Sequence, residues 1–83
     1  MDVFELVKKA ICKVEPGLDE SKIVPAALLK EDLDLDSLDR VELALSLEDE
    51  LGLYLQDEEM GDIITVGDVV ALIESKLKVE KRS

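Results

Sequence analysis

Ser37 is the residue of this chain best placed to take part in chemistry, and its neighbours indicate which kind. It lies in Asp36-Ser37-Leu38-Asp39, at what reads as the start of an amphipathic helix. A serine acts as a nucleophile only beside a base, and the chain has no histidine and no lysine obviously placed to serve. Another enzyme can still attach a group to such a serine, and the N–H groups of a helix start would stabilise a phosphate ester. The alternative is a serine that simply suits a helix start.

The chain is strongly acidic, and its charges are unevenly distributed. Its net charge is -11, and the stretch between Glu31 and Asp62 holds thirteen acidic residues and a single basic one, Arg40. Such a field repels nucleic acid and anionic lipid, and it attracts proteins with basic grooves over a Debye length of about 8–10 Å. We therefore expect protein partners, and no binding to nucleic acid or membranes. The alternative is a solvated acidic face that only maintains solubility.

Length and composition predict one small, folded domain. With 83 residues, of which 47% are hydrophobic, the chain is too apolar for a disordered acidic tail. Its apolar runs fall far short of the ~20 residues of a membrane span, and its N-terminus lacks a cationic region followed by an apolar block. These features predict a cytoplasmic protein, which we expect to be a monomer. One cysteine without histidine excludes an internal disulfide and ordinary zinc ligation.

The spacing of apolar residues predicts helices and no strands. Residues 2–15 and 37–51 have helical periodicity, residues 57–62 predict one short turn of helix, and a last helix is expected from Thr65. Residues 16–35 have no sustained period, so we expect a long ordered loop held against the core. The predicted fold is an all-α, small four-helix bundle with three long helices and one short helix. It forms a single domain over residues 1–83, ordered from about 2 to 78, with a flexible tail at 79–83.

Several helix ends are marked by capping residues. Asp36 is a good N-cap, and Asp39 three residues later gives a capping-box-like pair. Gly52 lies where a left-handed C-terminal cap is expected. Thr65 and Asp68 form a second capping pair before the last helix. The start of the helix that carries Ser37 is therefore predicted to be well defined.

The helix over residues 37–51 carries two apolar stripes, although a small bundle needs only one to reach its core. One stripe comprises Leu43, Ala44, Leu47 and Leu51; the other comprises Leu38, Val41 and Leu45 and is bordered by Glu42, Glu48 and Asp49. We interpret the second stripe, which begins beside Ser37, as an exposed docking surface in which apolar contacts give affinity and charge steers the partner. The alternative is that both stripes belong to the core.

Taken together, these motifs resemble the acyl carrier proteins, small acidic four-helix domains. The resemblance runs from Val3 to about Leu77. It rests on Asp36-Ser37-Leu38-Asp39 together with four flanking motifs at the spacing typical of the family: Glu31-Asp32-Leu33, Val41-Glu42-Leu43, Asp57-Glu58-Glu59 and Ile63-Ile64-Thr65-Val66. Each motif is short, but their order, spacing and charge are specific in combination.

The resemblance implies a function and a set of site residues. A separate phosphopantetheinyl transferase would attach 4'-phosphopantetheine from coenzyme A to Ser37, which Asp36 and Leu38 flank. The arm's thiol would hold an acyl chain as a thioester for enzymes of fatty-acid, lipid or polyketide biosynthesis, and the carrier itself would not be an enzyme. The implied partner-binding residues, which would meet basic docking grooves, are Leu38, Asp39, Val41, Glu42, Leu45, Glu48 and Asp49. The core between the helices would partly shelter the acyl chain.

Four positions depart from the family pattern. Asp34 and Leu35 stand where a glycine and a small residue usually precede the motif, so we expect a left-handed backbone at Asp34 and additional apolar surface at Leu35. Gln56 replaces a common proline and is expected to loosen the start of the short third helix. Cys12 falls on the polar face of the first helix, where the family has no functional thiol. These departures favour a carrier dedicated to one pathway.

Other functions remain as alternatives. Asp32, Asp34 and Asp36 resemble the opening of an EF-hand calcium loop, but Ser37 and Leu43 stand where that loop needs glycine and glutamate. An enzyme would need a base near its nucleophile, and none forms a recognisable constellation. A peptidyl or aminoacyl carrier shares the architecture, although the acidity favours the acyl type. An acidic interaction domain whose serine is never modified is the last alternative.

Overall fold

Four α-helices and one short 3-10 helix make up the chain in the computed structural model, which describes residues 2–82 and, within them, all side chains except those of residues 57 and 78–82. The α-helices are α1 (Val3–Val14), α2 (Ser37–Leu51), α3 (Asp57–Gly61) and α4 (Val66–Arg82), and the 3-10 helix η1 spans Glu20–Lys22. No strand occurs in the described part of the chain. The prediction of an all-α fold with three long helices and one short helix is confirmed.

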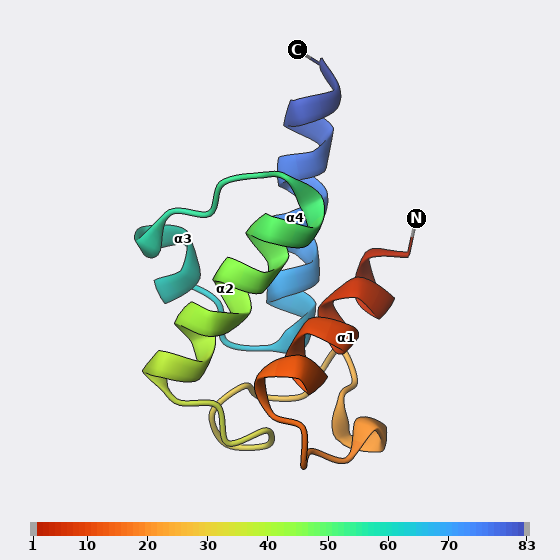
Figure 1. Ribbon diagram of the computed structural model, residues 1–83, viewed down its shortest axis with the longest axis vertical. Helices are drawn as coiled ribbons and strands as arrows, with labels where there is room; N and C mark the ends of the chain where they lie inside the picture. Colours follow the sequence, from red (N-terminus) through yellow and green to blue (C-terminus); the bar gives the residue numbers. More distant parts are fainter. Residues whose placement is uncertain (1, 83) are drawn as a thin grey trace.

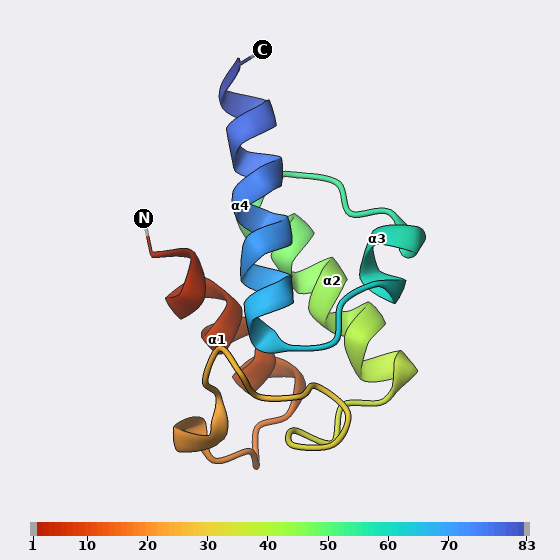
Figure 2. The ribbon, with the colours of Figure 1, turned by 180° about the vertical axis from the view of Figure 1, so that it is seen from behind.

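The helices form a bundle in which α1 packs against both α2 and α4, and α3 packs against α2 (Figure 1). The long α1–α2 loop crosses the end of the bundle at which α1 ends and α2 and α4 begin (Figure 2). The start of α2, with Ser37, therefore lies at one end of the bundle, next to this loop.

Within residues 2–82, no helix is both long enough and apolar enough to cross a membrane.

Apolar side chains spaced at helical intervals build the core, as the sequence predicts. Val3, Val7, Ala10 and Ile11 of α1 are buried, and so are Val66, Val69 and Ile73 of α4. Burial of each valine- or leucine-sized side chain contributes about 1.5–3 kcal/mol, so these faces hold the helices together. The helix limits lie within a residue of the predictions at most ends. However, α4 continues to Arg82, beyond the predicted limit of ordered structure at Lys78. The predicted flexibility of residues 79–83 stays a prediction, and Ser83 lies outside the described residues.

The predicted caps are present. Gly52 ends α2 with a left-handed backbone, at φ 66°. Before α4, the Asp68 N–H donates to Thr65 Oγ1 at 3.1 Å, while Asp68 Oδ2 accepts from the backbone N–H groups of Thr65 and Ile64 at 3.1 and 3.0 Å. These two backbone bonds, Thr65 first, hold the pKa of Asp68 below its usual value.

The loop over residues 15–36 is held on the core by both packing and hydrogen bonds. Its buried side chains are Ile23, Ala27, Leu29, Leu33 and Leu35. Backbone bonds join it to the start of α4: Val66 N–H donates to Ala27 O at 3.0 Å, and Gly67 N–H donates to Pro25 O at 2.8 Å. A side chain at Gly67 would bring its Cβ to 3.0 Å from Pro25 O, so glycine permits this close approach. The prediction of an ordered loop held against the core is confirmed.

Candidate functional site

Ser37 is the first residue of α2, and its side chain is exposed. A capping box fixes this helix start: the Asp39 N–H donates to Asp36 Oδ1 at 2.8 Å, and the Asp36 N–H donates to Asp39 Oδ2 at 3.3 Å. Both carboxylates are thereby held beside Ser37 as structural groups. The remaining N–H groups of the first turn have no partner within the helix, and they favour an anion at this end.

The chain approaches Ser37 through a turn that depends on Asp34. This residue has φ 57°, and it is the one non-glycine residue in the described range with a positive φ, as the sequence predicts. The expectation that Leu35 adds apolar surface is wrong, because the Leu35 side chain is completely buried. Its N–H donates to Leu29 O at 2.8 Å, which turns the residue into the core. Leu35 therefore anchors the segment before Ser37 instead of meeting partners.

We expect Asp34→Gly to stabilise the protein. The left-handed conformation costs an L-residue about 1–2 kcal/mol. Glycine avoids this strain but loses about 0.5–1 kcal/mol through the entropy of the unfolded chain. The net gain in the free energy of unfolding should therefore be about 0.5–1 kcal/mol, measured by urea denaturation. Asp34→Asn is the control, because it removes the charge while keeping tolerance of this backbone. If asparagine stabilises as much as glycine, charge repulsion and not backbone strain is responsible.

The two apolar stripes of α2 lie where the sequence predicts them. Leu43, Ala44 and Leu47 are buried and Leu51 is half-buried. Leu38, Val41 and Leu45 are exposed to 65%, 52% and 58%, and the neighbouring Glu42 and Asp49 are exposed too. Hydrophobic side chains of this size seldom form a continuous exposed strip on a monomer without a binding role. We call the residues Leu38, Val41, Glu42, Leu45 and Asp49 the α2 ridge.

A groove of about 460 Å³ begins at Ser37 and runs between α2 and the segment that contains α3. This volume is within the range of small-molecule sites. Its lining is mostly apolar and comprises Val41, Ala44, Leu45, Tyr54, Leu55 and Met60, together with Ser37, Arg40, Glu48 and Gly61. A flexible group attached to Ser37 would therefore have an apolar channel directly beside it.

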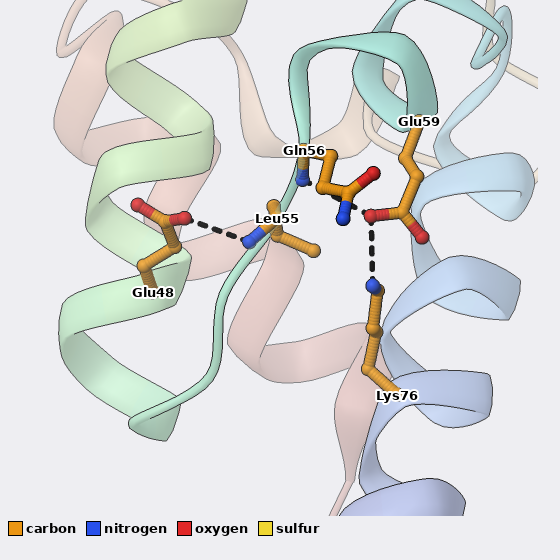
Figure 3. A network of polar contacts seen from close by, with 5 residues as sticks. All are labelled: Glu48, Leu55, Gln56, Glu59 and Lys76. Carbon is orange, nitrogen blue, oxygen red and sulfur yellow. Dashed lines mark hydrogen bonds and ion pairs between the residues drawn. The ribbon is translucent and has the colours of Figure 1, made fainter.

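Polar contacts hold the outer wall of this groove in place (Figure 3). Glu48 Oε2 accepts a hydrogen bond from Leu55 N–H at 2.7 Å, which ties the α2–α3 connection to α2. Glu59 Oε1 lies 2.7 Å from Lys76 Nζ and accepts from Gln56 N–H at 3.0 Å, so α3 is linked to α4. The Lys76 contact, followed by the Gln56 bond, holds the pKa of Glu59 below its usual value.

These contacts correct one expectation from the sequence, for Gln56, and add a structural role to another predicted residue, Glu48. Gln56 does not loosen the start of α3, because its N–H donates to Glu59 and a proline would have no N–H to donate. Glu48 was expected to face partners, yet its half-buried carboxylate binds the chain's own backbone. Glu48 thus has a structural role that the sequence did not indicate. Its contact with partners stays a prediction.

We expect Glu48→Ala to destabilise the fold by about 1–3 kcal/mol, because the Leu55 N–H would lose its acceptor. Glu48→Gln keeps an acceptor oxygen and should lose less. Asp49→Ala, an exposed neighbour, should change stability by no more than about 0.5 kcal/mol. Urea denaturation of the three variants measures the difference. Equal stability of the Glu48→Ala and Asp49→Ala variants would show that the Leu55 contact contributes nothing.

The acidic residues before Ser37 are engaged separately. Asp32 Oδ2 accepts from Leu28 N–H at 2.8 Å, whereas Asp36 caps α2. The two carboxylates therefore bind different parts of the backbone, and these bonds do not bring them together. Among the described side chains, no three acids or cysteines are grouped closely enough to hold a metal ion.

The surroundings of Cys12 are less polar than the sequence indicates. It is half-buried and packs against the core of the bundle, and not on a fully polar face. Burial, and then the negative charge of Glu20, raises the pKa of the Cys12 thiol, although Lys8 partly opposes this. A raised pKa reduces the thiolate fraction, so Cys12 is poorly suited to be a nucleophile.

Six residues of the groove were absent from the site predicted by sequence: Arg40, Ala44, Tyr54, Leu55, Met60 and Gly61. Arg40 had a signal, since it is the single base in a long acidic stretch. Tyr54 had a weaker one, as the chain's one tyrosine, and its side chain is 70% exposed. Met60 had none, because its place in the groove depends on how α3 folds back onto α2.

A family model described as a phosphopantetheine attachment site matches residues 5–73, which is most of the chain. The matched range includes Ser37, the α2 ridge and the groove. The site fits this group: an exposed hydroxyl at a helix start offers an attachment point, and the apolar groove beside it can receive a long flexible arm. The chain therefore belongs to the phosphopantetheine-attachment-site family, whose domain carries 4'-phosphopantetheine in covalent linkage.

Proposed function

We propose that this chain is an acyl carrier protein and that Ser37 is its attachment residue. The observation that carries the proposal is the exposed Ser37 at the start of α2, opening onto an apolar groove. When bound, the arm supplies a terminal thiol that holds an acyl group as a thioester. Domains of this family are carriers and not catalysts. With no histidine in the chain, we assign attachment to a separate phosphopantetheinyl transferase.

The attachment would form one bond and break another. Ser37 Oγ bonds to the phosphorus next to pantetheine in coenzyme A, and the bond from that phosphorus to the leaving nucleotide phosphate breaks. The serine proton passes to a base of the transferase, since the two carboxylates beside Ser37, those of Asp36 and Asp39, are engaged in the capping box. Free N–H groups in the first turn of α2 and the helix dipole support the added negative charge.

We propose the α2 ridge as the docking surface for the transferase and for acyl-handling enzymes. Its exposed leucines and valine would supply contact area, and Glu42 and Asp49 would steer basic grooves toward Ser37. Asp39, which is half-buried in the capping box, would contribute charge at the edge of the ridge.

We also propose that the protein is located in the cytoplasm, because coenzyme A and enzymes of fatty-acid, lipid and polyketide-type synthesis are found in the cytoplasm.

The apolar groove favours an acyl cargo over a peptidyl or aminoacyl one. Alkyl carbons gain from apolar burial, whereas an aminoacyl ammonium group would lose hydration there. We expect an octanoyl group on the arm to raise the melting temperature relative to the unacylated arm, and an alanyl group to leave it unchanged. Equal effects of the two groups would favour a carrier without an acyl preference.

The proposal is tested by intact-mass measurement. Protein is incubated with coenzyme A, magnesium and a promiscuous phosphopantetheinyl transferase. It should gain the mass of one 4'-phosphopantetheinyl group. An unchanged mass, with a known carrier loaded in a parallel reaction, would favour the alternative of an acidic interaction domain that is never modified.

A further inference from the structure

Arg40 is out of keeping with its surroundings in two ways. It is the single basic residue between Glu31 and Asp62, in a chain of net charge -11. Its side chain is half-buried, and its Nε atom is buried without any hydrogen-bond partner. Among the side chains that the structure describes, no carboxylate forms an ion pair with Arg40. A buried donor without an acceptor is rare in folded proteins and needs a physical explanation.

The position of Arg40 relative to Ser37 indicates what its guanidinium would meet. The two residues are three apart on α2, so they share a face with Cβ atoms about 5–6 Å apart. Helical side chains lean toward the N-terminus, which directs Arg40 toward the turn that carries Ser37. Both residues line the same groove. An anion bonded to Ser37 Oγ would therefore lie within reach of the Arg40 side chain.

Three acids close to Arg40 in the sequence or in the groove already accept backbone hydrogen bonds. Asp36 and Asp39 each accept a backbone N–H of the other in the capping box, and Glu48 accepts the Leu55 N–H. The guanidinium offers Nε–H and Nη–H donors in parallel, a fork that matches two oxygens of a phosphate. A phosphodiester on Ser37 presents two such non-bridging oxygens at the mouth of the groove.

We propose that Arg40 binds the phosphodiester that joins the arm to Ser37, an inference that rests on the proposed function. Arg40 is a positioning residue. It satisfies its buried Nε–H with a phosphate oxygen and offsets the charge that attachment adds to an acidic region. It thereby directs the first part of the arm along Val41 and Leu45 into the groove, so that this part of the arm does not move freely in solvent. The arm then leaves Ser37 on the groove side of α2.

The test follows the Arg40 Nε–H signal by NMR in uniformly ¹⁵N-labelled protein. The chain has two arginines, so Arg40→Lys assigns the signal by its loss. Mass measurement on the same sample establishes loading. In loaded protein we expect the Nε–H proton to move downfield and to exchange more slowly with water than in unloaded protein. A loaded sample with an unchanged signal overturns the role of Arg40 while leaving the proposed function intact. A sample that never loads overturns both.

Substitution gives an independent measurement. Arg40→Gln should shift the ³¹P resonance of the phosphodiester and lower the melting temperature of the loaded form relative to the unloaded form. Arg40→Lys keeps the charge, so its ³¹P resonance should lie between that of the Arg40→Gln variant and that of the unsubstituted protein. Lys30→Gln, the same charge change at an exposed loop residue, should behave as the unsubstituted protein does. If Arg40→Gln fails to fold, the Nε–H measurement decides alone, since it needs no substitution for its main comparison.

A last measurement distinguishes binding of the tethered phosphodiester from binding of free phosphate. Inorganic phosphate is titrated into the Ser37→Ala variant while the Arg40 Nε–H signal is observed. We expect no shift at concentrations of phosphate equal to the protein concentration, because a free anion lacks the tether that holds the ester at the groove. A full shift under these conditions would overturn the proposal in favour of a general anion site.

Discussion

Replacing Ser37 by alanine should abolish attachment of the phosphopantetheine arm, the largest effect that we expect from any single substitution. The substitution removes the one oxygen that the transferase would modify. The helix start should survive, because Asp36 and Asp39, and not Ser37, make the capping box. We expect the free energy of unfolding to change by no more than about 0.5 kcal/mol. Intact mass after incubation with transferase and coenzyme A measures the loss, and circular dichroism checks the fold.

Two other serines serve as matched controls. Ser46 lies on the same helix with its Oγ buried and without a hydrogen-bond partner, and Ser21 is exposed in η1. Neither stands at the start of an α-helix beside the groove, so Ser46→Ala and Ser21→Ala should load fully. If the Ser37→Ala variant still gains one arm while either control loses it, the attachment residue has been misassigned.

The helices and caps could be predicted because their signals are local. Apolar spacing of three and four residues defines α1, α2 and α4, and Asp36 with Asp39 marks the start of α2 within four consecutive residues. The separation of α2 into a buried and an exposed stripe also follows from its own sequence, since a short bundle can bury one stripe only. The accessible position of Ser37 is a consequence of these local features.

The features that the sequence did not reveal depend on contacts between distant segments. Leu35 could only be recognised as buried from the turn at Asp34 and the bond to Leu29. Glu48 reads as a surface acid until the α2–α3 connection folds back and presents the Leu55 N–H. The same folding back creates the groove, which is why its lining from Tyr54 to Gly61 was not expected.

Reversing charge on the α2 ridge should slow loading more than any substitution that leaves Ser37 in place. Glu42→Lys and Asp49→Lys together change the local charge by four while the exposed positions keep the fold intact. Electrostatic steering raises association rates by factors of about 10–1,000, so we expect kcat/KM of the transferase for this carrier to fall at least about tenfold at low salt. Initial rates at limiting carrier concentration measure it.

A control with the same change in charge separates the effect of where the charges lie on the ridge from the effect of the protein's net charge. Glu5→Lys with Glu74→Lys makes the same change at exposed residues of α1 and α4. This control should reduce the rate much less, because only charges beside Ser37 orient the encounter. Raising the ionic strength to 1 M shortens the Debye length to about 3 Å, and the difference between the two double variants should then largely disappear. Equal rates for both at low salt would show that partners respond to total charge, and the α2 ridge would lose its role as the docking surface.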